Sequence, residues 1–244
     1  MFPIRDHNPS ARTPYVTLSL IAINVSIFLA GLALLQDQRT LAQFYFDYAL
    51  LPARLSEGEN FAALVTSVFL HGGIMHLAGN MLFLWIFGDN LEDEMGHIPF
   101  LLFYLACGIG ASLVQFAFDP RSVIPIVGAS GAIAGVMGGY LLLFPKARVD
   151  VFIFFIVFFR VLPIPAWIML GLWFALQLFS GINVDTSNGG VAYWAHAGGF
   201  VIGLLLTLPL WFRLGGVLFW RQTDGHPPHP ETTYGRSNIP IVRR

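Results

Sequence analysis

The sequence predicts an all-α membrane protein: six spanning helices in a compact bundle, with a membrane-associated loop after the first helix. Two observations carry this prediction. Hydrophobic residues make up 56% of the 244 residues and charged residues 11%, whereas a soluble domain carries about a quarter charged residues. Apolar stretches also recur at close to the length of roughly 20 residues that a helix needs to cross a bilayer. Most of the surface is therefore expected to face lipid.

Charges and prolines set the ends of these stretches. A polar, amphipathic loop at residues 36–60 follows the first span, and Asp119-Pro120 and Pro145 end the third and fourth. Residues 151–159 are very apolar but too few to cross the membrane alone. The six spans are expected at residues 15–35, 70–88, 98–118, 128–145, 166–181 and 191–212, within a membrane domain that covers residues 1–221.

Two polar segments lie at the inner side of this arrangement. An acidic turn is expected after the second span, because Asp89, Glu92, Asp93 and Glu94 follow its last apolar residues. Glu92 either remains solvated or bonds to the third helix. Residues 222–244 contain many Pro, His, Thr and Arg residues and are expected to form a disordered cytoplasmic tail.

The distribution of cations predicts the orientation. With the N-terminus inside, only Arg39, Arg54 and Arg121 fall outside. The other lysines and arginines then lie inside: Arg5, Arg12, Lys146, Arg148, Arg160, Arg213, Arg221, Arg236, Arg243 and Arg244. This is a positive-inside bias, so we expect a multi-pass protein of the inner (plasma) membrane with both termini cytoplasmic. The second, fourth and sixth helices then all run from outside to inside.

Composition also argues against several classes of partner. The formal net charge of −1 argues against a nucleic-acid partner, which would require clustered cations. The single cysteine, Cys107, excludes an internal disulfide and a multi-cysteine metal site. His71 and His76 are five residues apart, and no His-Glu-x-x-His string occurs, so no metal or other cofactor is expected. Charged residues near the start and a long first apolar run argue against a cleavable signal peptide.

Polar residues within the spans converge at one depth. The second span contains His71, His76 and Asn80, the fourth contains Ser130 two residues after its start, and the sixth contains His196. All lie near the outer ends of helices that run in the same direction. Because polar groups are expensive in a bilayer, such residues are candidates for function.

Helical spacing indicates how these residues meet. His76 and Asn80 are four apart and share a helix face. His196, Gly199 and Gly203 also share a face, and small residues at such spacing allow two membrane helices to approach closely. The fourth span supplies the matching small residues: Gly128, Gly131, Gly135 and Gly138. Packing of the sixth helix on the fourth would bring His196 to Ser130.

These residue types suit acyl transfer. A lone serine in a membrane helix usually bonds a backbone carbonyl, and a lone histidine usually serves packing. Their coincidence at one depth favours a nucleophile, Ser130, and a base, His196. His76, Asn80 and the backbone N–H of Ser130 are then candidates to stabilise an oxyanion. Asp185 in the adjoining loop is assigned no role.

This pattern resembles the rhomboid family of intramembrane serine proteases. The matching motifs are His71-x4-His76-x3-Asn80, Gly128-Ala129-Ser130-Gly131 and Ala195-His196-x2-Gly199-x3-Gly203. Their order, spacing and helix count match the family across residues 14–213. The chain resembles the minimal six-helix bacterial type, with the loop after the first span as the family's membrane-associated loop.

The resemblance implies a Ser130–His196 dyad, an oxyanion site at His76 and Asn80, and a structural hydrogen-bonding role for His71. It further implies substrates that are transmembrane segments of other proteins, cut near the outer membrane face. The chain departs from the family at three positions. Ala62 and Ala63 replace a common Trp-Arg pair, and Ala134 replaces an aromatic residue that can stack on the catalytic imidazole. Tyr193 or Trp194 are alternative neighbours for that ring.

Two other classes of function stay open. A small-solute transporter or channel would predict internal repeat symmetry and polar sites at the midplane, and neither is visible. A catalytically inactive relative that binds membrane clients would typically lack Ser130 or His196, and the chain has both.

Overall fold

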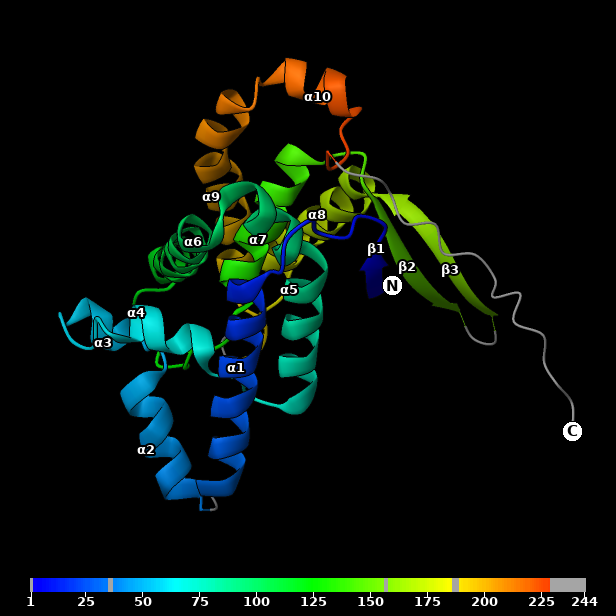
Figure 1. Ribbon diagram of the computed structural model, residues 1–244. Helices are drawn as coiled ribbons and strands as arrows, with labels where there is room; N and C mark the ends of the chain where they lie inside the picture. Colours follow the sequence, from blue (N-terminus) through cyan, green and yellow to red (C-terminus); the bar gives the residue numbers. More distant parts are fainter. Residues whose placement is uncertain (1, 35–36, 156–157, 186–188, 229–244) are drawn as a thin grey trace, which may run out of the picture.

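The protein is largely helical, and a small sheet extends from one side of a helical bundle (Figure 1). The structure, a computed structural model, describes residues 2–34, 37–155, 158–185 and 189–228. In chain order the elements are β1 (Phe2–Asp6), α1 (Tyr15–Leu34), α2 (Gln38–Tyr48), α3 (Pro52–Ser56), α4 (Ala63–Thr66), the 3-10 helix η1 (Ser67–Phe69), α5 (Ile74–Met95), α6 (His97–Phe118), α7 (Ser130–Leu143), β2 (Arg148–Phe155), β3 (Phe158–Pro165), α8 (Ala166–Asn183), α9 (Tyr193–Arg213) and α10 (Val217–Thr223).

The membrane character of the chain follows from its long apolar helices. Within the described residues, α1, α6, α8 and α9 are long and apolar enough to cross a bilayer. Residues 63–69 and α5 form a pair bent by 95°, which makes a fifth candidate if the pair counts as one broken span. The prediction of a helical, multi-pass membrane protein is therefore confirmed at this level.

Helix α5 differs from the predicted second span in both of its ends. It begins at Ile74 rather than residue 70, because Gly72 and Gly73 lie in the bend that precedes it. His71 is therefore outside the helix. At the other end α5 continues to Met95, so the predicted acidic turn is wrong. Its carboxylates lie in the last turns of the helix, where one of them is almost completely buried.

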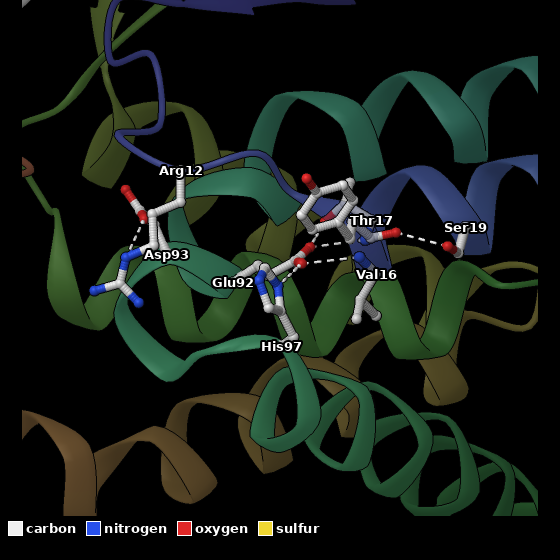
Figure 2. Close-up of polar contacts among 8 residues, drawn as sticks. Arg12, Val16, Thr17, Ser19, Glu92, Asp93 and His97 are labelled. Carbon is white, nitrogen blue, oxygen red and sulfur yellow. Dashed lines mark hydrogen bonds and ion pairs between the residues drawn. The ribbon is translucent and has the colours of Figure 1, made fainter.

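That buried carboxylate, Glu92, joins the starts of two other helices (Figure 2). It accepts hydrogen bonds from the backbone N–H of Val16 at 2.8 Å and of Thr17 at 2.7 Å, and from the Thr17 hydroxyl at 2.8 Å. On its other side Nδ1 of His97, the first residue of α6, lies 2.6 Å away. The first N–H groups of a helix have no partner within the helix and attract negative charge. Glu92 therefore caps α1 and also bonds to α6, the predicted third spanning helix. Of the two alternatives for Glu92, the bond to that helix is the one the structure contains, and Glu92 is not simply solvated.

Helix α7 lies at the centre of the bundle and is short. It spans 14 residues, and all but three of them are buried. At a rise of 1.5 Å per residue it measures about 21 Å, less than the roughly 30 Å of a hydrocarbon core. The helix begins at Ser130 itself, not two residues earlier, because Gly128 has a φ of +121° that no helix accommodates. It ends before Pro145, whose ring disfavours a helical residue in front of it.

A three-stranded antiparallel sheet is the clearest departure from the all-α prediction. The apolar stretch that begins at residue 151 is too short to cross the membrane, and instead it contributes to both strands of the hairpin β2–β3. The N-terminal strand β1 pairs with β2 on the other side. β-branched and aromatic residues favour this pairing, while Pro163 and Pro165 disfavour a helix. Arg5 and His7 each lie 2.8 Å from the Asp150 carboxylate, so the chain start is held to the sheet.

The loop after α1 forms a compact arm of short helices, which lies to one side of the bundle in Figure 1. Arg54 donates to the carbonyl of Phe46 at 2.7 Å, and its guanidinium carbon lies 4.1 Å from the centre of the Phe46 ring. Backbone hydrogen bonds join Leu50 and Ile126 at 3.1 and 2.8 Å, which connects the arm to the loop before α7. Ala63 is buried without exposed surface. These contacts, rather than a Trp-Arg pair, anchor this loop.

The beginning of the predicted disordered tail is folded. Helix α10 extends into it, and the backbone N–H of Lys146 donates to the carbonyl of Gly225 at 3.0 Å. The Lys146 ammonium also forms an ion pair with Asp224 at 2.5 Å. Disorder was expected from polar composition alone, which does not register such contacts with a distant loop. The rest of the tail, residues 229–244, lies outside the described residues.

Candidate active site

Helices α7 and α9 meet along a seam of glycines. A Cβ on Gly199 would collide with the carbonyl oxygen of Gly131, and a Cβ on Gly203 would collide with that of Gly135. The two backbones therefore touch directly, as small residues in membrane helices permit. This seam sets the depth and rotation at which the first turns of α7 and α9 face each other.

At the end of the seam, Ser130 and His196 form a hydrogen-bonded pair. The Nε2 atom of His196 lies 2.8 Å from Oγ of Ser130. Ser130 is the first residue of α7, and His196 lies in the first turn of α9. That turn is held by Gln115 of α6, whose Oε1 accepts the N–H of Ala195 at 3.1 Å. A hydroxyl and an imidazole at this distance can exchange a proton.

The opposite edge of the His196 ring contacts α8. Its Nδ1 lies 2.9 Å from Oε1 of Gln177, and the Trp173 ring lies 5.9 Å from the imidazole, tilted by 31°. The aromatic neighbour that Ala134 does not supply thus comes from another helix. Trp194, one of the expected neighbours, instead stacks on Phe118 of α6 with ring centres 3.9 Å apart.

Sequence reasoning missed Gln177, although a signal was present. Gln177 is a polar side chain inside the predicted fifth span, near the same end as the other polar residues. Polar residues within a membrane span are candidates for function by default. By that rule Gln177 is a candidate together with His76, Asn80, Ser130 and His196.

His76 and Asn80 lie against the turn that precedes Ser130. A Cβ on Gly128 would come within 2.7 Å of His76 Nε2 and 3.5 Å of Asn80 Nδ2. Gly128 therefore leaves room for both side chains two residues before Ser130. Since Ser130 begins α7, its own backbone N–H has no partner within the helix and stays available at the positive end of the helix dipole.

His71 orients one of these groups from outside the helix. The amide nitrogen of Asn80 donates to Nε2 of His71 at 2.9 Å, and both side chains are buried. The rings of His71 and His76 meet edge to face, with centres 5.1 Å apart. An asparagine amide carries two N–H donors. One is used by His71, so the other is left for a group in front of Ser130.

A cavity of about 770 Å³ connects the four side chains that face one another here, and His71 and Gln177 lie behind its lining. Its lining includes the polar residues His76, Asn80, Ser130 and His196, together with two loop segments, residues 124–127 and 189–192. These loops lead into α7 and α9. Apolar lining from Met75 and Phe83 of α5 and Trp173 of α8 surrounds the polar group. The arrangement can hold an extended peptide carbonyl between a nucleophile and hydrogen-bond donors.

Comparison with known proteins identifies relatives of this chain. A family model described as the Rhomboid domain matches residues 58–213. The chain is 31% identical over 193 residues, 77% of its length, to the mitochondrial Rhomboid protein 1 of Saccharomyces cerevisiae. It is 35% identical over 177 residues, 72% of its length, to RHOMBOID-like protein 4 of Arabidopsis thaliana. Over a shorter stretch of 87 residues, 36% of its length, it is 46% identical to Rhomboid protease GluP of Bacillus subtilis.

The relatives are considerably longer than the aligned regions. The alignments cover 51%, 41% and 16% of these three proteins. The chain thus spans about half their length or less.

Proposed function

Because the chain belongs to the rhomboid family, we propose that it is a serine endopeptidase that cleaves transmembrane segments of other membrane proteins. The observation that carries the proposal is the 2.8 Å contact between Ser130 Oγ and His196 Nε2 inside a cavity that also contains His76 and Asn80. The family includes proteases by name, and both residues of a Ser–His pair are present and in contact.

The mechanism follows from the roles of these groups. Ser130 Oγ attacks the peptide carbonyl carbon while His196 takes the hydroxyl proton, and a C–O bond forms as the carbonyl oxygen becomes an oxyanion. His196 then gives its proton to the leaving amine, the C–N bond breaks, and the acyl group stays on Ser130. Water attacks this ester with His196 again as base, which releases the acid and restores Ser130. His76, Asn80 and the Ser130 N–H stabilise both oxyanions.

The orientation predicted from the cations supports the proposed substrate class and location. With the cations inside, α5, α7 and α9 begin at the outer face, so the cavity lies in the outer part of the membrane. A transmembrane segment that unwinds there would present its backbone to Ser130. In this proposal the broken pair 63–69 with α5, and the short α7, complete a six-helix bundle with α1, α6, α8 and α9. The membrane is the inner (plasma) membrane, and both termini are cytoplasmic.

Cleavage of a model transmembrane substrate by the purified protein, reconstituted in liposomes, tests the proposal. Ser130→Ala and His196→Ala are expected to lower the rate by about a thousandfold or more. Ser19→Ala is the matched control: its hydroxyl bonds the Tyr15 carbonyl within α1, away from the cavity. Mass spectrometry of the products locates the cut, expected near the outer boundary of the segment.

A second readout separates the alternatives. A fluorophosphonate should label Ser130 in the wild type and not in His196→Ala. Folded protein that neither cuts nor becomes labelled would overturn the proposal and favour a client-binding relative. Equal cleavage by all variants would trace the activity to a contaminant.

A further inference from the structure

A side chain of α8 contacts the edge of His196 that faces away from Ser130. Oε1 of Gln177 lies 2.9 Å from Nδ1, while Nε2 lies 2.8 Å from the Ser130 hydroxyl. The imidazole is therefore held from both sides, by groups on two different helices.

We propose that Gln177 is a positioning residue that keeps His196 in the tautomer required of a base. A neutral imidazole has one N–H donor and one acceptor nitrogen. A carbonyl oxygen is only an acceptor, so its contact with Nδ1 places the ring proton there. Nε2 is then the acceptor, with its lone pair toward the Ser130 hydroxyl. This inference rests on the proposed function.

The contact between Gln177 and His196 matters most in the step in which His196 becomes protonated. When His196 takes the Ser130 proton, both ring nitrogens become donors. The Gln177 oxygen then accepts a hydrogen bond from a charged group, which is stronger than the bond to the neutral ring. The amide is thus placed to favour the state that follows proton transfer, without adding a charge to the membrane interior. An amide here occupies the place that a carboxylate holds in a three-residue arrangement.

The packing of α8 makes this contact sensitive to the position of the helix. Its buried residues are Ala166 and Leu170, both near its start. Further along, α8 meets α9 through rings, among them Phe174 stacked on Phe200 with centres 4.8 Å apart. Gln177 lies beyond this contact. The orientation of His196 therefore depends on α8 lying against α9.

Two substitutions at Gln177 distinguish positioning from packing. Gln177→Leu removes the acceptor and is expected to lower kcat and the rate of fluorophosphonate labelling by about tenfold to a hundredfold, with KM changed by less than about twofold. Gln177→Glu keeps an acceptor and fixes the same tautomer. It should preserve labelling and move the acidic limb of the pH–rate profile to higher pH, because a carboxylate stabilises the imidazolium.

Phe174→Leu is the matched control for a loosened α8, because it removes a ring between α8 and α9 and leaves the amide in place. It should not move the pH–rate profile. The proposal fails if Gln177→Leu keeps wild-type kcat and labelling, or if Phe174→Leu moves the pH–rate profile as far as Gln177→Glu does. It also fails if Gln177→Glu lowers kcat and labelling as much as Gln177→Leu does and leaves the pH–rate profile unchanged.

Ser130→Ala and His196→Ala, measured in parallel, separate this inference from the function on which it rests. If both are silent while Gln177→Leu is fully active, only the positioning role is overturned. If both still cut, the proposed function fails.

Discussion

At the scale of single residues, the site works with neutral polar groups in a place where charge is expensive. Asn80, His71 and Gln177 each supply a hydrogen bond without a formal charge, and each has an identified partner. Hydrogen bonds strengthen in a low-dielectric interior, and unpaired polar groups there are costly. The Asn80 donor and the His196 imidazole beside Ser130 are thus held in advance of any substrate.

Asn80→Ala should lower kcat by about a hundredfold and change KM little, since an oxyanion donor acts mainly in the transition state. It also leaves the buried His71 without its donor, so a loss of stability of about 1–3 kcal/mol is expected alongside. Steady-state kinetics and thermal unfolding in detergent measure the two effects. Asn24→Ala is the control, because Asn24 is also buried but bonds the Leu20 carbonyl within α1. Equal kcat values for the two variants would show that Asn80 does not stabilise the oxyanion.

At the scale of elements, two devices position the helices. The glycine seam fixes α7 against α9, and the Glu92 carboxylate fixes the end of α5 against the starts of α1 and α6 (Figure 2). The glycine seam works because its residues have no side chains, and the Glu92 contact works because hydrogen-bond donors surround a buried carboxylate. Together they determine where the cavity-lining residues of α5, α7 and α9 meet.

Gly203→Ala is expected to separate the two helices, because the new methyl group would meet the Gly135 carbonyl. Overpacking of this kind typically costs 1–3 kcal/mol, and cleavage should fall by more than about tenfold because small displacements of reacting groups are costly. Gly171→Ala in α8 is the control, since nothing lies within 4 Å of its added Cβ. Wild-type melting and cleavage in Gly203→Ala would contradict the direct backbone contact.

Glu92→Gln should lower the free energy of unfolding by about 2–3 kcal/mol, because only one oxygen remains to accept from the Val16 and Thr17 N–H groups and the charge that strengthens these hydrogen bonds is lost. Glu94→Gln, two residues along the same helix, serves for comparison and should change stability much less. Thermal unfolding followed by tryptophan fluorescence measures both. A similar melting temperature for the two variants would argue that Glu92 is not a cap.

At the scale of the whole molecule, the N-terminal strand is tied to the bundle through the half-buried carboxyl group of Asp6. The Tyr140 hydroxyl of α7 donates to Asp6 at 3.0 Å, and Asn8 donates to that hydroxyl at 3.2 Å. Burial, and then the negative charge of Asp89, raise the pKa of Asp6 to about 7. The folded protein therefore favours protonated Asp6 over the ionised form.

This pKa predicts how stability varies with pH. A carboxyl group whose pKa rises from 3.8 to about 7 on folding contributes stability that is fully present below pH 3.8 and is lost as the pH rises through 7. The melting temperature of the wild type should fall over this window, and Asp6→Asn, which mimics the protonated group, should flatten the decline. Unfolding measured at half-unit steps of pH tests this. An identical slope in both proteins would exclude Asp6 as its source.

How much of this was accessible from the sequence depends on the range of the interactions. The pairing of Ser130 with His196 follows from glycine spacings and helix direction, which are local patterns on two helices. The burial of Glu92 in the last turns of α5 depends on α1, because a buried carboxylate is stable only where donors such as the N–H groups at the start of α1 receive it. No pattern near Glu92 reports that partner.

The sheet and Gln177 illustrate two further limits. Apart from Arg148, Asp150 and Arg160, the residues of β2 and β3 are apolar, so alternation does not reveal the strands, and the pairing of β2 with β1 joins segments far apart in the chain. Gln177 is visible as a polar residue in a span, but its contact with His196 depends on the rotation of α8. That rotation follows from ring packing and not from a spacing rule.

The seam between α7 and α9 also limits which amino-acid substitutions the chain can accept during evolution. Elsewhere in a core, an enlarged side chain can be offset by a second change that shrinks its neighbour. Where Gly199 meets Gly131 and Gly203 meets Gly135, the obstacle is a carbonyl oxygen, and no substitution makes a peptide group smaller. Suppressors of a change at Gly203 should therefore arise away from α7, at positions that let the helices tilt. Gly199 and Gly203 therefore lack compensatory partners across the seam, so each of the two must be retained on its own account.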